Sequence, residues 1–215
     1  MSNDLVGVNQ SISAVIPAYF EEKTIASVVS GCLPYVDEVI VVNDGSTDNT
    51  SNEALRAGAK VIELERNTGV ANAVQRGLRE ASGDILVTLD ADGQHSPEEI
   101  SRLVEPIIQG DYDLVMGVRP SLPHYSERVL TWLTSLKVPC SDVSTGFRAI
   151  RKNVSDKMNL HGTCLCGVFI LEAARQGARI KCVPISVHER EGPRRIQTSH
   201  IRQFFIVLWY LARSL

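Results

Sequence analysis

The chain has 215 residues, of which 44% are hydrophobic and 22% charged, so it can form one globular domain and is not a disordered protein. Its net charge of −3 excludes the strongly basic field typical of nucleic-acid-binding proteins. The five cysteines lack the paired spacing of a zinc site and are expected to be free, mostly buried thiols in a reducing cytosol.

The first half of the chain alternates predicted strands and helices. Strands are expected at 12–17, 38–43, 60–65, 85–89 and 114–117, and helices at 21–32, 50–57 and 70–81. Another helix is expected to start at Ser96, with Pro97 at its first position and Glu99 completing a capping box. This alternation predicts a mostly parallel sheet with helices on both faces.

The second half is less regular. An amphipathic helix is expected at 128–136, a loop feeding a short strand at 142–151, and a helix at 169–175 that Gly177 ends. The segment 180–187 predicts a strand at the edge of the sheet, because Pro184 has no amide hydrogen to donate to a neighbour.

The two ends of the chain bear on its location. Residues 1–10 do not have the pattern of a signal peptide, and no apolar run is long enough to span a bilayer, which predicts a cytoplasmic protein. Residues 203–212 are apolar almost all round, and five arginines but one glutamate lie between Arg190 and Arg213. A basic, aromatic segment of this kind suits a membrane surface, and a terminal helix packed on the core is the other interpretation.

Polar or glycine-containing clusters follow five predicted strands, at 17–19, 43–46, 67–69, 90–92 and 117–119. In open parallel sheets, ligands bind beyond the carboxyl ends of the strands, so these clusters predict one site. Asp90 and Asp92 are the most informative, because carboxylates beside a core are costly to desolvate without a cation. A divalent metal that holds a phosphate meets that need, and a pair of turn or capping acids is the alternative.

Other polar residues receive simpler interpretations. Asp44 is expected to bind a ligand, whereas the residues 46–48 after it are expected to form a turn and cap the next helix. His95 and His188 are expected to be capping or surface residues. The chain has neither a G-x-G-x-x-G motif after its first strand nor a P-loop, which argues against a dinucleotide dehydrogenase and a P-loop NTPase.

Four segments in this order, 15–22, 41–48, 88–95 and 144–149, resemble family 2 glycosyltransferases. The resemblance runs from about Ile12 to Ile196 and is strongest to the dolichyl-phosphate mannosyltransferase and polyprenyl-phosphate glycosyltransferase group. It implies an α/β GT-A fold, a mostly parallel Rossmann-like sheet with helices on both faces. The expected domain spans residues 1–196, followed by a C-terminal amphipathic or apolar helix at 197–215.

The resemblance also implies the residues of the site. The nucleotide-sugar donor would be bound by Pro17, Tyr19, Glu21, Val42, Asp44, Asp90, Ala91, Asp92, Arg119, Arg190 and Arg195. Mg²⁺ or Mn²⁺ would be held by Asp90, Asp92 and Gln94, and the acceptor phosphate by Thr145, Arg148 and Arg128. The catalytic residues would be Asp92, Arg119 and Arg148.

The implied activity is metal-dependent, inverting transfer of a hexose from GDP-mannose or a UDP-sugar to a polyprenyl or dolichyl phosphate. A metal and arginines would stabilise the charge that develops on the diphosphate leaving group. The phosphate acceptor is already ionised, so no strong base is needed, and Asp142 is the candidate base if the acceptor is a hydroxyl. The implied location is the cytoplasmic membrane face, on the lipid surface or a membrane partner protein. The alternatives are a non-lipid acceptor, a sugar nucleotidyltransferase or a non-catalytic binding module.

Overall fold

The computed structural model describes residues 10–122, 124–162, 164–189 and 200–213. Seven strands form one sheet in the order β3-β2-β1-β4-β6-β5-β7. The strands are β1 (Ile12–Ala18), β2 (Glu38–Asn43), β3 (Lys60–Glu63), β4 (Ile85–Thr88), β5 (Leu114–Val118), β6 (Arg148–Arg151) and β7 (Ile180–Pro184). All pairings are parallel except those of β6, which runs antiparallel to both β4 and β5. The predicted mostly parallel sheet is confirmed.

The order of the strands reverses at β1. The chain moves from β1 to β2 and β3 on one side, then returns to place β4 on the other side of β1. Such a reversal leaves a crevice beyond the carboxyl ends of the two central strands. Because β6 is antiparallel, its first residue, Arg148, lies opposite Thr88 near the carboxyl end of β4. An amino end therefore joins the carboxyl ends at one edge of the sheet.

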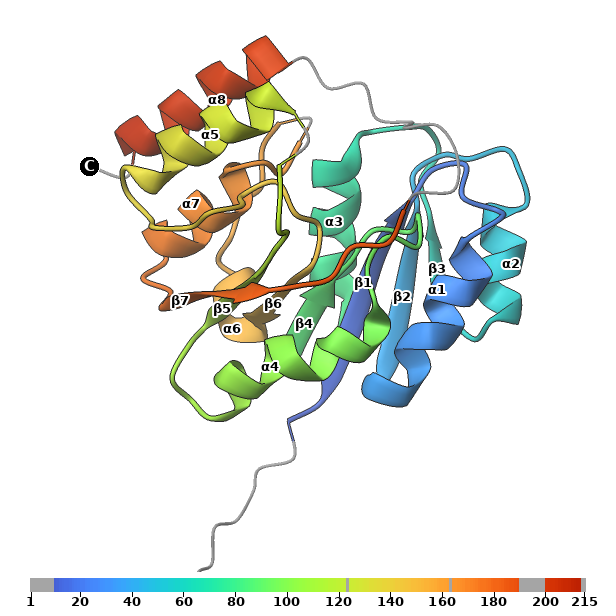
Figure 1. The fold of residues 1–215 in the computed structure, drawn as a ribbon. Helices are drawn as coiled ribbons and strands as arrows, with labels where there is room; N and C mark the ends of the chain where they lie inside the picture. Colours follow the sequence, from blue (N-terminus) through green and yellow to red (C-terminus); the bar gives the residue numbers. More distant parts are fainter. Residues whose placement is uncertain (1–9, 123, 163, 190–199, 214–215) are drawn as a thin grey trace, which may run out of the picture.

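Helices cover both faces of the sheet (Figure 1). They are α1 (Ile25–Cys32), α2 (Thr50–Arg56), α3 (Val70–Glu80), α4 (Ile100–Ile108), α5 (Tyr125–Ser135), α6 (Lys152–Ser155), α7 (Val168–Arg175) and α8 (His200–Arg213). Side chains of β1 alternate between the faces, since Val15 packs in one hydrophobic cluster while Ala14 and Ile16 pack in the other. The first cluster includes residues of α3, α5, α7 and α8, and the second those of α1, α2 and α4.

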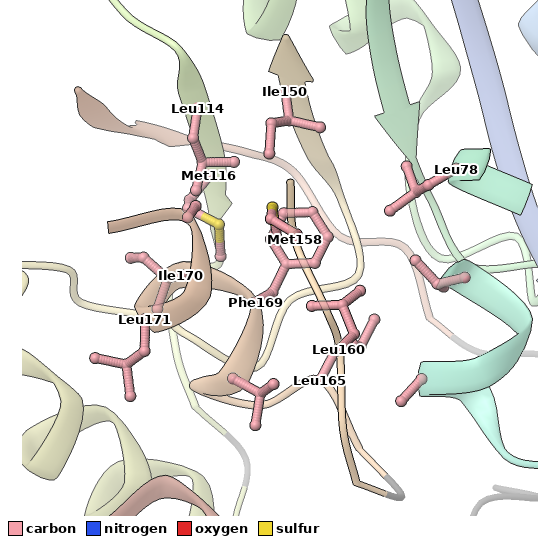
Figure 2. Packing of buried hydrophobic residues seen from close by; sticks show 14 of the residues in the cluster. Leu78, Leu114, Met116, Ile150, Met158, Leu160, Leu165, Phe169, Ile170 and Leu171 are labelled. Carbon is pink, nitrogen blue, oxygen red and sulfur yellow. The ribbon is translucent and has the colours of Figure 1, made fainter. Parts of the chain in front are cut away.

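Figure 2 shows part of the first cluster, where Ile170 lies near Met116 of the sheet and Phe169 lies near Met158. Phe169 is fully buried. Its ring also lies under the guanidinium of Arg148, 4.7 Å from the ring centroid, so the core directly supports a charged residue at the functional edge.

Most predicted elements are confirmed, with ends displaced by a few residues. The first helix begins at Ile25 rather than residue 21, because 19–24 form a loop and turn. The capping box at Ser96 was wrong: residues 97–99 form a 3₁₀ turn, and Ser96 makes no capping hydrogen bond. Glu99 instead accepts hydrogen bonds from the amide of Ser186 at 3.0 and 3.2 Å, tying the start of α4 to the segment after β7.

Helix α8 packs on the core through one face and lies beside α5 (Figure 1). Val207 and Tyr210 are buried, and Gln203 donates hydrogen bonds to the carbonyls of Cys164 and Cys166 at 3.1 and 2.9 Å. Within the described residues, no helix is both long and apolar enough to cross a bilayer.

Replacing Gly77 with alanine tests the contact between α3 and the sheet. Glycine inside a helix costs about 0.5–1 kcal/mol relative to alanine, so local propensity predicts that Gly77→Ala stabilises the protein. The structure predicts the opposite, because the new Cβ would lie 2.3 Å from Cγ1 of Val15 and 3.0 Å from Cγ2 of Val42. We expect overpacking to lower the free energy of unfolding by about 1–3 kcal/mol in urea titrations.

The control is Ser101→Ala at an exposed position of α4, where a change within about 0.5 kcal/mol is expected. A Gly77→Ala protein as stable as the wild type would show that β1 and α3 are not closely packed at this point.

Candidate active site

A cavity of about 1140 Å³ lies at the edge of the sheet where β1, β2, β4 and β5 end and β6 begins. This volume is sufficient for a large small-molecule ligand or cofactor. The described residues that line it include Pro17, Tyr19, Glu21, Asp44, Thr68, Asp90, Ala91, Asp92, Gln94, Arg119, Glu127, Thr145 and Arg148. Three of the five predicted strand-end clusters, those at 17–19, 67–69 and 90–92, line the cavity in full, and the other two contribute Asp44 and Arg119.

The loop after β1 is held by polar side chains of the loop after β2 and of the first residue of α2. The amide of Phe20 donates to Oγ of Ser46 at 2.9 Å, and the amide of Glu21 donates to Oγ1 of Thr50 at 2.9 Å. Phe20 has φ of 57°, a left-handed conformation that is uncommon and strained for an aromatic residue. Ser46, which was expected only to form a turn, therefore also anchors the loop that carries Tyr19 and Glu21.

Asp44 organises a third loop. Its Oδ1 accepts from the amide and the hydroxyl of Thr68 at 2.7 and 2.8 Å, and its Oδ2 accepts from the amide of Gly69 at 2.9 Å. A carboxylate offers about four acceptor positions, so most of the capacity of Asp44 is occupied by the protein itself. The segment 67–70 that it holds lines the cavity directly.

The acidic motif lies at the centre of the cavity. Asp90 has 44% of its side chain exposed, and Oδ1 of Asp92 accepts from the amide of Gln94 at 3.1 Å. A Cβ on Gly146 would lie 2.3 Å from a carboxylate oxygen of Asp90. A side chain at 146 would displace this carboxylate from its present position, so the segment before β6 shapes the acidic site.

His95 was expected to be a capping or surface residue, but the structure shows that it is buried. It is 5% exposed and packs on Phe147 with ring centroids 5.2 Å apart. Burial lowers the pKa of His95, although the charges of Asp90 and Asp92 oppose this shift, so the ring is neutral at pH 7. Nδ1 of the neutral ring accepts a hydrogen bond from the backbone amide of Asp90 at 3.5 Å, so His95 supports the acidic motif.

The segment after β7 is fastened to the turn that carries Gln94. The amide of His188 donates to the carbonyl of Gln94 at 2.9 Å, and the side-chain amide of Gln94 donates back to the carbonyl of His188 at 3.3 Å. The His188 ring lies 2.7 Å from Oγ of Ser96, and His188 is exposed as predicted.

Arg119 is clamped by two buried carboxylates. Its Nε and Nη2 donate to Oδ2 and Oδ1 of Asp142 at 2.6 and 3.0 Å, and Nη2 also lies 3.2 Å from Oε2 of Glu127. Burial alone would lower the pKa of Arg119, but hydrogen bonds and charge from Asp142, with the charge of Glu127, raise it. Because Asp142 is fully buried in this bidentate pair, its geometry is that of an anchor rather than a general base.

Arg148 is 2% exposed yet lines the cavity. One nitrogen donates to the carbonyl of Thr145, whereas Nε and Nη1 have no hydrogen-bond partner among the described residues. Burial lowers the pKa of Arg148 to about 10, while Asp90 and Asp142 favour its charged form, so it stays a cation at pH 7. A buried cation with unsatisfied donors is costly without an anion to receive them.

Two cysteine contacts depart from the expectation of separate free thiols. Cys164 and Cys166, both on the cavity wall, form a disulfide. Cys140 and Cys182 are free, with sulfur atoms 2.8 Å apart, and Cys32 is a buried free thiol as predicted.

The predicted site residues separate into three groups. Those lining the cavity are Pro17, Tyr19, Glu21, Asp44, Asp90, Ala91, Asp92, Gln94, Arg119, Thr145 and Arg148. Val42 instead packs in the core, and Arg128 is exposed on α5 and does not line the cavity. Arg190 and Arg195 lie outside the described residues.

Glu127 is the main functional residue that the sequence analysis missed. The predicted helix began three residues too late, at 128, whereas α5 begins at Tyr125, so the prediction left Glu127 outside the helix. Glu127, Leu130, Thr131 and Thr134 are all buried, at the i, i+3, i+4 and i+7 positions of one helix face. An acid on the inner face of a helix was the signal that it has a buried cationic partner.

Comparison with known proteins agrees with this geometry. A family model described as Glycosyl transferase family 2 matches residues 13–176. The chain belongs to glycosyltransferase family 2. The predicted family, GT-A fold and enzyme class are thereby confirmed.

Two curated relatives show how far the similarity extends. The chain is 31% identical over 211 residues to the UDP-N-acetylglucosamine–dolichyl-phosphate N-acetylglucosaminyltransferase of Methanococcus voltae, covering 81% of this chain and 84% of that one. It is 35% identical over 166 residues to the undecaprenyl-phosphate 4-deoxy-4-formamido-L-arabinose transferase of Shewanella sediminis, covering 68% of this chain. The matched part is 50% of the Shewanella enzyme, so this glycosyltransferase spans about half of that relative's length.

Among solved structures, the glucosyl-3-phosphoglycerate synthase of Mycobacterium tuberculosis bound to Mn²⁺ and UDP-glucose superposes with a TM-score of 0.79 and 28% identity. The superposition covers 96% of this chain and 79% of that one. It extends the agreement in fold to an enzyme crystallised with a metal and a nucleotide sugar.

Substituting Asp142 tests its function as the anchor of Arg119. Asp142→Asn removes the fully buried charge of this ion pair, and we expect it to lower the free energy of unfolding by about 3 kcal/mol. The matched control is Glu53→Gln, which breaks the exposed pair with Arg56 and should cost about 0.5 kcal/mol or less. Chemical denaturation of the three proteins measures the difference. Equal losses in the two variants would contradict the clamp.

Proposed function

We propose that this glycosyltransferase moves a sugar from a nucleoside-diphosphate donor to the phosphate of a polyprenyl lipid, with a divalent cation bound at the donor diphosphate. The observation that carries the proposal is Arg148, which lines the same cavity as the acidic motif and has a buried guanidinium with two unpaired donors among the described residues. The wall that contains Arg148 can thus bind an anion directly. The wall that contains the acidic motif can bind an anion through a metal ion.

The acceptor phosphate belongs at Arg148 and Thr145. Arginine donors match phosphate oxygens in geometry and charge, and burial strengthens such a contact. Thr145 is buried next to Arg148, and both line the cavity. The names of the Methanococcus and Shewanella relatives specify dolichyl phosphate and undecaprenyl phosphate, which supports a phosphate-bearing lipid.

The donor diphosphate belongs at Asp90, Asp92 and Gln94, where Mg²⁺ or Mn²⁺ would be held. The described residues contain no group of three or more histidine, cysteine, aspartate or glutamate side chains that forms a closed metal site. Two carboxylate residues and a glutamine that line a cavity still fit these ions, which usually bind one or two carboxylates together with substrate phosphates. The cation would supply charge to the departing diphosphate.

The protein groups then divide the chemistry. Arg119, fixed by Asp142 and Glu127, is directed at the leaving diphosphate and stabilises its growing charge without reorganisation. An acceptor phosphate oxygen attacks the anomeric carbon as the bond to the diphosphate breaks, in one displacement that inverts this centre. The acceptor carries no proton that must be removed, which agrees with the engagement of Asp142 by Arg119.

A UDP-sugar is the donor that we favour over GDP-mannose. The Methanococcus relative is named for UDP-N-acetylglucosamine, and the mycobacterial synthase was crystallised with UDP-glucose. The base and ribose would lie between the loop of Tyr19 and Glu21 and the segment 67–70 that Asp44 holds.

We further propose that the enzyme lies peripherally on the cytoplasmic membrane face through α5 and α8. Large apolar side chains are exposed on these adjacent helices, namely Tyr125, Trp132 and Leu136 on or next to α5, and Phe205, Leu208 and Trp209 on α8. We call these six residues the apolar face. Exposed aromatic residues that gather in this way suit the interface of a bilayer, where a lipid acceptor presents its phosphate.

A non-lipid acceptor is the second candidate, because the superposing mycobacterial synthase is named for glucosyl-3-phosphoglycerate. A phosphate site at Arg148 also suits a phosphorylated small acceptor. Transfer to a hydroxyl requires a base, and the carboxylate placed for that task, Asp142, is bound to Arg119. This contact favours a phosphate as the nucleophile.

Asp92→Ala tests the donor half. We expect loss of sugar transfer by at least about 100-fold and loss of the Mn²⁺-dependent thermal stabilisation by UDP-glucose, because a ligand stabilises the native state that binds it. Asp111→Ala, an exposed aspartate at the opposite edge of the sheet, is the control and should match the wild type. Full activity of Asp92→Ala would refute the metal assignment.

Arg148→Lys tests the acceptor half. Lysine keeps the charge but loses the planar set of donors, so we expect the KM for polyprenyl phosphate to rise about 10-fold while donor binding is unchanged. Thr145→Val, a milder change beside it, should shift the same constant in the same direction. Arg151→Lys, in the same strand but outside the cavity, is the control. A change confined to donor binding would place the acceptor elsewhere.

A further inference from the structure

A second cavity, of about 370 Å³, lies beside α8 and shares no residue with the active-site cavity. Its walls are formed by His161, Gly162, Arg202, Phe205, Ile206 and Trp209. We call it the α8 pocket. The glycosyltransferase chemistry uses none of these residues, so the pocket needs another explanation.

The shape of the α8 pocket is built into the fold. Gly162 has φ of 118°, which favours glycine, and a Cβ there would lie 3.2 Å from Cδ1 of Ile206. Next to it, the amide of His161 donates to the hydroxyl of Tyr210 at 3.1 Å, and that hydroxyl donates to the carbonyl of Asn159 at 2.9 Å. The loop is therefore fastened to the buried side of α8, and the pocket lies between two fixed elements.

The chemistry of the α8 pocket combines an apolar floor with the guanidinium of Arg202 and the imidazole of His161. Arg202 and His161 are exposed at its walls, while Ile206 is half-buried. The guanidinium of Arg213 lies 4.3 Å from the centroid of Trp209, and the His161 ring lies 6.4 Å from the same centroid. The sequence of α8 contains no aspartate or glutamate. Such a site selects an anion that carries apolar substituents.

The position of the α8 pocket indicates where that anion comes from. Phe205 and Trp209 line the pocket and also belong to the apolar face. A helix that lies on a bilayer buries its apolar face about 5–10 Å into the boundary between head groups and acyl chains. A pocket that shares two residues with this face would then open at the depth of the lipid phosphates.

We propose that the α8 pocket binds the phosphate of an anionic phospholipid head group, with Arg202 as its principal donor and His161 as a second one. The proposal rests on the peripheral membrane contact of the proposed function and adds a preference for anionic lipid. Arginine can donate two hydrogen bonds to one phosphate. General attraction to a charged surface requires no such directed contact. The site would orient α8, and with it the enzyme, on the membrane.

Vesicle co-sedimentation of the full chain tests the proposal. We expect the wild type to bind vesicles of phosphatidylcholine with phosphatidylglycerol at least about 10-fold more tightly than vesicles of phosphatidylcholine alone. Removing any one cation near an anionic surface weakens binding about fivefold, so Arg202→Gln must exceed that loss. We expect Arg202→Gln to abolish most of the preference for phosphatidylglycerol while leaving binding to vesicles of phosphatidylcholine alone unchanged.

Two control variants separate a site from general attraction. Lys137→Gln removes an exposed cation next to Leu136 of the apolar face and should show only the general loss. Arg79→Gln makes the matched substitution at an exposed residue near the end of α3, away from the apolar face, and should bind like the wild type. Equal losses in Arg202→Gln and Lys137→Gln, or no preference for phosphatidylglycerol in the wild type, would overturn the proposal.

Two further measurements complete the test. The first distinguishes a lipid head group from free phosphate as the ligand, and the second tests the proposed function independently of the α8 pocket. Inorganic phosphate that stabilises the wild type but not Arg202→Gln, without any vesicle preference, would identify a site for free phosphate and overturn the head-group assignment. Transfer to a short-chain polyprenyl phosphate in detergent tests the proposed function separately. Arg202→Gln should retain this transfer, because Arg202 does not line the active-site cavity.

Discussion

Thr88 and Arg148 stand opposite one another in the β4–β6 ladder, and this antiparallel register brings a buried guanidinium to the acidic end of β4. If β6 were parallel to β4, its carboxyl end would lie at this edge of the sheet. Its first residue, Arg148, would then lie at the opposite edge, where the other strands begin. The reversal of β6 therefore places Arg148 and Thr145 in the same cavity as Asp90 and Asp92. The packing of Gly146 against Asp90 depends on the same pairing.

Charge balance explains why two arginines can be buried at this edge. Arg119 is neutralised within the protein, because Asp142 and Glu127 are themselves buried and accept its hydrogen bonds. Among the described residues, no carboxylate forms a hydrogen bond with Arg148, and its cationic form is favoured by the longer-range charges of Asp90 and Asp142. The protein thus leaves one cation incompletely satisfied where a ligand anion is expected, a free-energy cost that pre-organises the site.

The apolar cores on the two faces of the sheet carry these polar features. Phe169 supports Arg148 from the cluster that also anchors α8, while His95 packs on Phe147, which belongs to the cluster on the opposite face. Helix α8 links the same core to the exterior, since Val207 and Tyr210 face inward while Phe205 and Trp209 are exposed. The catalytic edge and the proposed membrane contact therefore share a rigid support.

The sequence by itself determined the alternation of strands and helices, the edge position of β7 and the gathering of strand-end clusters. These features follow from local periodicity and from the rule that parallel strands end at one edge. Its motifs also identified the family, because the order of four segments carries that information. It could not assign the partners of Asp44, Glu99 and His95, since each contact depends on segments that are distant in sequence or on burial that only packing reveals.

Tertiary structure alone decided that Asp142 anchors Arg119 rather than standing free, that Val42 lies in the core, and that Arg128 lies outside the cavity. An isolated aspartate, valine or arginine in a sequence gives no direction to its side chain. The direction of Val42 follows from the face of β2 that packs in the core, and that of Arg128 from the face that α5 turns inward. Both result from the packing of the whole chain against the sheet.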